Sequence, residues 1–200
     1  MAHGLLDRVA QNPFWFHWLR KLPELNYRET KSRIAAVRDR LGEPHVLDVG
    51  CGTGEFAHLF DPRSYVGVDV SDADVRFAER RNPWHRFECS DMRVWESAGR
   101  TFSLVLVNGI LHHLDDATAR EVLGRAAACG APGSTVLVIE EVELPNAGLG
   151  TRLVHRMDEG EHIRSADEWR RLVGGVIPIA ESSTYVSGLC PYFLLVCPKR

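Results

Sequence analysis

The chain has 200 residues, 44% of them hydrophobic, and a formal net charge of −3 at pH 7. This length predicts one α/β domain with at most a small cap. The slight acidity argues against nucleic acid as an obligatory substrate, because phosphate contacts require a basic surface.

The cysteine pattern and the hydropathy of the chain indicate its cellular compartment. The five cysteines include no CxxC pair, which is typical of reduced thiols. No apolar run is long enough to cross a membrane, and the N-terminus lacks the unbroken apolar core of a signal peptide. We therefore expect a cytoplasmic protein without membrane insertion.

The first segment, residues 1–25, contains a run of aromatic side chains. On a helix, residues this close would cover more than one face, so the segment either packs on the domain edge or lines a pocket. Both interpretations stay open at this point. If the segment lines a pocket, the pocket would also include the start of the helix that follows. The expected substrate-contacting residues are then Trp15, Phe16, Trp18 and Tyr27.

Residues 27–41 are expected to form a helix, because apolar side chains recur there at helical spacing. Asn26 and Glu29 have the spacing of a capping box at its start, and Gly42 marks its end. With the aromatic segment, this helix would form an N-terminal helical cap over residues 1–42.

The stretch from His45 to Phe56 reads His-Val-Leu-Asp-Val-Gly-Cys-Gly-Thr-Gly-Glu-Phe and is typical of a nucleotide-type site. A buried strand ends in glycines at alternate positions, which bring backbone N–H groups close to a ligand, and helical spacing then resumes up to about residue 60. Where dinucleotide folds need a third small residue, this chain has Glu55, which with Asp48 would repel a pyrophosphate. The loop therefore favours a nucleoside that carries a positive centre.

Two further acids follow the next strands. Asp69 ends the second strand, where a carboxylate can accept both hydrogen bonds of a ribose diol. Asp91 follows the third strand and could accept a hydrogen bond from an exocyclic amine, while Met92 offers an apolar surface to a purine. These acids share the carboxyl-terminal edge of the predicted sheet.

The rest of the core alternates strands and helices. Ser71, Asp115 or Asp116, and Ser165 are expected helix caps. Residues 144–165 are rich in glycine, histidine and charge and are interpreted as an insertion over the sheet edge. The expected strands are 65–69, 85–89, 102–108, 134–142, 176–185 and 192–197, and the expected helices are 72–81, 117–129 and 165–173.

Five motifs in order, VLDVGCGTG, VGVDVS, CSDM, FSLVLVNGILHHL and APGSTVLVIEE, resemble the class I S-adenosylmethionine-dependent methyltransferases of small-molecule type. The resemblance implies an α/β fold with a doubly wound, Rossmann-like seven-stranded sheet whose last strand is antiparallel. It also implies a single domain over residues 1–200, with the helical cap 1–42, a cofactor-binding core 45–143 and a substrate-side insertion 144–165.

The same resemblance implies a donor site for S-adenosyl-L-methionine, with S-adenosyl-L-homocysteine as the product. The glycine loop would hold the methionine moiety, the second-strand acid the ribose, the third-strand loop the adenine, and the end of the fourth strand would pass beside the sulfonium. The implied cofactor-binding residues are Asp48, Gly50, Cys51, Gly52, Gly54, Asp69, Val70, Asp91, Met92, Asn108 and Gly109.

Two adjacent histidines, His112 and His113, follow the fourth strand. Neighbouring residues of a helix point in different directions, so we expect no shared metal but one packed ring and one ring facing the pocket. A hydroxyl acceptor would benefit from a general base, and histidine titrates in the right range. The candidates, in order, are His113, His155 and His162.

The expected function is in-line methyl transfer to a small, hydrophobic or aromatic metabolite, with O-methylation favoured. The alternative is a protein of natural-product metabolism that binds the same donor without transferring its methyl group, as a non-methylating catalyst or a binding module. Methylation of protein or RNA is less favoured by the acidic balance. The expected state is a monomer or homodimer.

Overall fold

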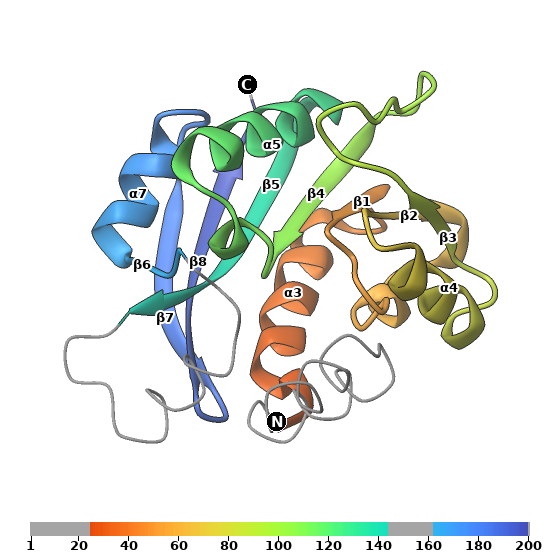
Figure 1. The fold of residues 1–200 in the computed structure, drawn as a ribbon, viewed down its shortest axis with the longest axis horizontal. Coiled ribbons are helices and arrows are strands. Elements are labelled where there is room, and N and C mark those ends of the chain that lie inside the picture. The colour runs from red at the N-terminus through yellow and green to blue at the C-terminus, as the bar shows by residue number, and fades with distance from the viewer. Residues whose placement is uncertain (1–24, 144–161, 200) are drawn as a thin grey trace, which may run out of the picture.

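The computed structural model of the chain describes residues 25–143 and 162–199. Its strands form one mixed sheet with the order β3-β2-β1-β4-β5-β8-β7, and helices cover both faces (Figure 1). Strands β1 to β5 pair in parallel, and β8 is antiparallel to both β5 and β7. This confirms the predicted doubly wound sheet of seven strands with an antiparallel last strand. A two-residue strand, β6, additionally pairs with β5.

The element bounds follow the expected ranges closely in the core. The strands are β1 Val46–Val49, β2 Tyr65–Asp69, β3 Arg86–Cys89, β4 Phe102–Asn108, β5 Gly130–Glu143, β6 Arg164–Ser165, β7 Glu181–Ser187 and β8 Cys190–Pro198. The helices are α3 Arg28–Leu41, α4 Asp72–Arg81, α5 Asp116–Cys129 and α7 Ala166–Gly174, with 3-10 turns η1 Leu25–Tyr27, η2 Ala57–Leu59, η3 Pro62–Ser64 and η4 Leu111–His113.

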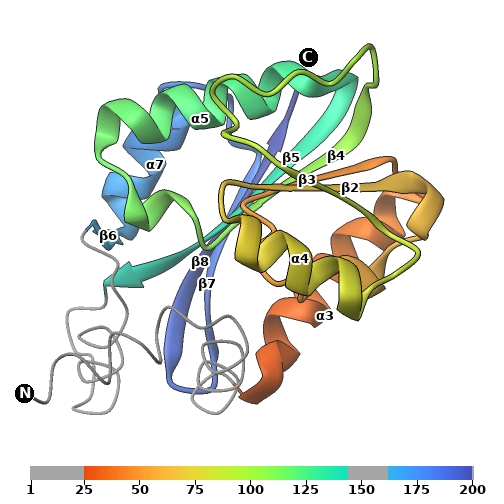
Figure 2. The ribbon, with the colours of Figure 1, turned by 45° about the vertical axis from the view of Figure 1, so that its right-hand side comes forward.

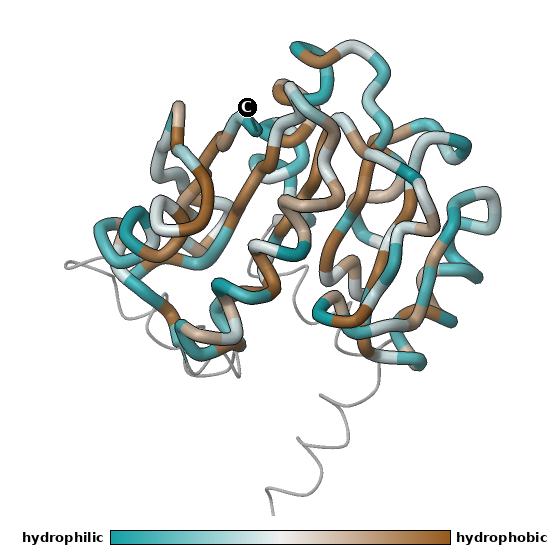
Figure 3. The backbone as a smooth tube through the Cα atoms, turned by 90° about the horizontal axis from the view of Figure 1, so that it is seen from above, coloured by the Kyte–Doolittle hydropathy of each residue, from teal (hydrophilic) through white to brown (hydrophobic). Residues whose placement is uncertain are grey.

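An apolar cluster lies on each side of the sheet. Helices α5 and α7 pack on one face, and α3 and α4 pack on the other (Figures 1 and 2). Strand β4 contributes to both clusters, with Val105 and Val107 on the first face and Leu104 and Leu106 on the second. Apolar stretches accordingly run along the central strands in Figure 3. Among the described residues, no helix is long and apolar enough to span a membrane.

The helix starts confirm most of the predicted caps. Helices α4, α5 and α7 begin at hydrogen-bonding side chains, which are Ser71, Asp115 and Ser165. The prediction for α3 is wrong: its N-cap is Tyr27, in a left-handed conformation with φ 56° and no side-chain cap. Asn26 is also left-handed, with φ 60°, and Glu29 pairs with Arg33 one turn further on.

Two other expectations need correction. The segment after the glycine loop forms only the 3-10 turn η2, which ends in extended backbone at Phe60, and Pro62 keeps Asp61 before it extended as well. Strand β7 begins at Glu181 rather than at Val176. The N–H groups of Val176 and Ile177 instead bond to the end of α7, and the next residue, a proline, has no N–H to donate.

Candidate functional site

A cavity of about 540 Å³ lies at the carboxyl ends of β1, β2 and β4. Its volume falls in the range of small-molecule sites, roughly 300–1,000 Å³. The strand order reverses between β1 and β4, and open α/β sheets bind ligands at such a switch point. The implied cofactor residues that line the cavity are Gly50, Cys51, Gly52, Asp69, Val70, Asp91, Met92, Asn108 and Gly109.

The glycine turn is left-handed at Gly50, Gly52 and Gly54, a conformation that glycine adopts without steric cost. A Cβ on Gly50 would lie 2.6 Å from Cδ1 of Ile110, whereas a Cβ on Gly52 would meet nothing within 4 Å. Gly50 therefore lets two loops pack together, and the space beside the Gly52 Cα is open. Gly54 is buried and lies outside the cavity lining, contrary to expectation.

Asp69, at the end of β2, is held in place by backbone donors. The N–H of Gly52 donates to Oδ2 at 2.8 Å, and the N–H of Ser71 donates to Oδ1 at 2.9 Å. A carboxylate has about four acceptor positions, so both oxygens can still accept hydrogen bonds from a ligand. Asp69 is thus a preoriented acceptor in the cavity wall.

Asp91 and Met92 contribute to the cavity in different ways. The guanidinium of Arg93 donates to Asp91, with Nη2 and Oδ2 2.6 Å apart, and the Arg93 N–H donates to Oδ1. These bonds lower the pKa of Asp91. Met92 is buried and presents an apolar surface. An amine of a ligand would therefore meet an Asp91 that already has a cationic partner.

Asp48, expected among the cofactor-binding residues, is not part of the cavity lining. It is 2% exposed, and the hydroxyl of Tyr65 donates to its Oδ2 at 2.6 Å. Burial raises the pKa of Asp48 to about 7, the Tyr65 hydrogen bond opposes that rise, and the charge of Asp69 adds to it. Asp48 lies in the core, on the strand that leads into the glycine turn.

Glu55 also lines the cavity, but two cations compensate its charge, so it would repel an anionic ligand less than the sequence suggested. Lys31 from α3 and Arg81 from α4 donate to its two oxygens. Burial would raise the pKa of Glu55, but these partners outweigh it and hold the pKa at about 2. The cluster ties α3 and α4 to the glycine turn.

The two histidines take the predicted separate roles. His112 is fully buried, and its Nδ1 lies 2.7 Å from Oε2 of Glu140. His113 is exposed and lines the cavity, with its ring centroid 4.1 Å from that of His112. His162 lies outside the lining, and its N–H donates to the His112 carbonyl. His155 lies outside the described residues, among which no group of three side chains could hold a metal ion.

Aromatic side chains form another part of the lining. Tyr27 lines the cavity and meets Phe56 edge to face, with ring centroids 5.7 Å apart. Phe56 and Tyr192 also line the cavity and were not anticipated as site residues. Tyr192 stacks on Tyr185, whose hydroxyl donates to Thr30 of α3. The other expected substrate residues, Trp15, Phe16 and Trp18, lie outside the described residues.

Comparisons with known proteins agree with this geometry. A family model described as a methyltransferase domain matches residues 16–175. Trans-aconitate 2-methyltransferase of Variovorax paradoxus is 30% identical over 134 residues, which cover 64% of this chain and 51% of the relative. The chain thus spans about half the length of the curated relatives it matches.

Two solved structures share the fold over most of their length. The N-methyltransferase NodS of Bradyrhizobium japonicum, in complex with S-adenosyl-L-homocysteine, superposes with a TM-score of 0.71 at 17% identity, covering 98% of this chain and 97% of NodS. Magnesium protoporphyrin IX methyltransferase of Synechocystis gives a TM-score of 0.71 at 15% identity, covering 91% of this chain and 87% of the other. At such identities the likeness establishes the fold alone.

Proposed function

The chain belongs to the methyltransferase domain family, and we propose on this basis that it transfers the methyl group of S-adenosylmethionine to a small acceptor molecule. The observation that carries the proposal is the carboxylate of Asp69, held by the N–H groups of Gly52 and Ser71 in the cavity wall. Its oxygens suit the two hydroxyls of a ribose.

The charges of the cavity also suit this donor. Asp69 and Asp74 line it, no lysine does among the described residues, and Arg93 is already engaged by Asp91. No α-helix begins directly after the glycine turn, so the usual phosphate-binding helix N-terminus is missing from that place. A nucleoside with a cationic centre therefore fits better than a nucleotide. When bound, S-adenosylmethionine supplies a methyl carbon activated by its sulfonium.

The protein's part in methyl transfer is to align the acceptor and exclude water. We propose that Tyr27, Phe56 and Tyr192 supply the apolar wall for a hydrophobic or aromatic acceptor, since all three line the cavity. His113 is the candidate base that takes the proton of an acceptor hydroxyl, which favours O-methylation. A positioned base of this kind contributes roughly 10²–10⁴-fold to the rate.

Titration calorimetry with S-adenosylhomocysteine tests the donor site. Hydrogen bonds to a charged group are each worth about 1.5–3 kcal/mol, so Asp69→Asn should weaken binding by roughly 10- to 100-fold. Asp72→Asn is the matched control, since Asp72 is an exposed acid on α4 that pairs with Arg76. Equal affinity of the wild type and Asp69→Asn, or no binding by either, would refute the donor site.

Methyl transfer itself needs a separate measurement. The protein is incubated with methyl-labelled S-adenosylmethionine and pooled hydroxylated aromatic, polyketide and lipid acceptors, and the label is followed by mass spectrometry. We expect label on an acceptor oxygen and a loss of at least about tenfold in rate for His113→Gln. Binding of the donor with the label retained on it throughout would instead support a non-methylating protein.

A further inference from the structure

The loop from Gly109 to Leu114 joins β4 to α5 and carries His113, the candidate base. On one side of this loop lies Glu140 of β5, which is fully buried. Its Oε1 accepts the N–H groups of Ile110 at 3.1 Å and Leu111 at 2.8 Å. Its Oε2 accepts the backbone N–H of His112 at 3.3 Å and lies 2.7 Å from the ring Nδ1. One carboxylate thus accepts three consecutive backbone N–H groups of the loop.

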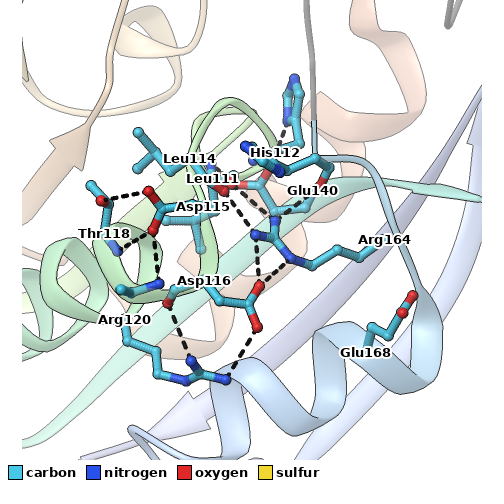
Figure 4. Close-up of polar contacts among 12 residues, drawn as sticks. Leu111, His112, Leu114, Asp115, Asp116, Thr118, Arg120, Glu140, Arg164 and Glu168 are labelled. Carbon is cyan, nitrogen blue, oxygen red and sulfur yellow. Dashed lines mark hydrogen bonds and ion pairs between the residues drawn. The ribbon is translucent and has the colours of Figure 1, made fainter.

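Arg164 of β6 binds the same loop through its carbonyl groups. Its Nη1 donates to the carbonyl of Leu111 at 3.1 Å, and its Nη2 donates to that of Leu114 at 2.7 Å. The same guanidinium donates from Nε to Oδ1 of Asp116, the first residue of α5, at 2.9 Å. Figure 4 shows the Arg164 side chain reaching from β6 to the loop and to α5. Its position is fixed further by the Trp169 ring, 4.7 Å away.

Holding a loop through buried charged side chains costs free energy. Glu140 is fully buried and Arg164 is 8% exposed, and a buried charge is expensive unless hydrogen bonds satisfy it. Here the hydrogen bonds of Glu140, and two of those that Arg164 donates, fall on one short segment that borders the cavity. An apolar contact could cover the loop but could not fix the direction of its N–H and carbonyl groups, as a planar guanidinium and a carboxylate do.

The fixed backbone determines where His113 stands. His112 is tied to Glu140 by both its backbone and its ring, and the His113 ring lies beside it. We propose that Arg164 and Glu140 are positioning residues that hold His113 at the cavity by fixing its loop from both sides. The consequence for methyl transfer rests on the function proposed above.

Together, Arg164 and Glu140 form a clamp on the loop. Hydrogen exchange measured by NMR on the full chain tests this clamp without any substrate. Arg164→Met and Glu140→Gln should each lower the protection of the Leu111 and His112 amides by at least about tenfold relative to amides of β1 and β2. Arg120→Met is the matched control, since the exposed Arg120 also pairs with Asp116. Unchanged loop protection in both variants, or a loss spread evenly over the sheet, would overturn the clamp.

Kinetics then separate positioning from general stability. With the acceptor found for the wild type, Arg164→Met should lower kcat at least about tenfold while the affinity for S-adenosylhomocysteine changes less than about twofold, since misplacement of about 1 Å can cost 10²-fold. Arg164→Lys should not restore kcat, because an ammonium cannot reach both loop carbonyls in a fork geometry. Full rescue by lysine, or loss of donor affinity in parallel with kcat, would contradict the proposal. If the wild type neither binds the donor nor methylates, the proposed function fails and hydrogen exchange still decides the clamp.

Discussion

Replacing Asp48 with asparagine should flatten the dependence of the protein's stability on pH. The pKa of Asp48 is raised from 3.8 to about 7, mainly because the side chain is buried. The folded state therefore holds this proton more tightly than the unfolded chain does. The stability that the proton contributes is fully present below pH 3.8 and is lost as the pH rises through about 7.

The size of this effect follows from the two pKa values. Each pKa unit corresponds to about 1.36 kcal/mol. Most of the unfolded chains have lost the proton by pH 5, whereas most folded molecules keep it until the pH approaches 7. Between pH 5 and pH 8, the free energy of unfolding should fall by roughly 3 kcal/mol through Asp48.

Urea unfolding of the wild type and Asp48→Asn at several pH values measures this directly. The amide of asparagine stays neutral and can still accept the Tyr65 hydroxyl, so the difference between the two proteins isolates the titration. Tyr65→Phe removes a hydrogen bond that lowers the pKa of Asp48, so the transition should move to higher pH. Asp39→Asn, at an exposed site on α3, serves as the control. Parallel curves for the wild type and Asp48→Asn would refute the reasoning.

Two further predictions concern groups around the glycine turn. Glu55→Gln should lower the free energy of unfolding by about 2 kcal/mol, because Lys31 and Arg81 lose their anion. The wild type, but not the variant, should also lose stability as the pH falls from 4.5 towards 2, because protonation of Glu55 breaks the same ion pairs. Burial, together with the nearby Asp48 and Asp69, raises the pKa of the Cys51 thiol, so iodoacetamide at pH 8 should alkylate the exposed Cys89 and spare Cys51 in the native protein. Equal labelling of both cysteines by mass spectrometry would contradict this picture.

The sheet could be predicted because its signals are local. Strand β4 is nearly all apolar, and β1 and β2 each end in an acid or a glycine turn at the expected place. The side of β1 on which the Asp48 side chain lies also follows from the sequence. Alternate residues of a strand face opposite sides, which puts Asp48 on the face of Val46 and away from Leu47 and Val49.

The charge compensation in the site could not be predicted in the same way. Glu55 is paired with residues 24 positions before it and 26 positions after it, so its partners are defined only once α3 and α4 pack on the sheet. Glu140 and Arg164 likewise meet the histidine loop from β5 and β6. The sequence around His113 contains no trace of either contact.

The contact between Gly50 and Ile110 limits how such a cavity can evolve. Because a Cβ at residue 50 would lie 2.6 Å from the Ile110 side chain, and because the φ of Gly50 is +69°, residue 50 cannot gain a side chain without moving the glycine turn or Ile110. Adaptation to a new acceptor is therefore expected to accumulate at other lining positions, such as Tyr27 and Tyr192. Libraries for directed evolution should vary those two tyrosines and leave residues 50 and 110 unchanged.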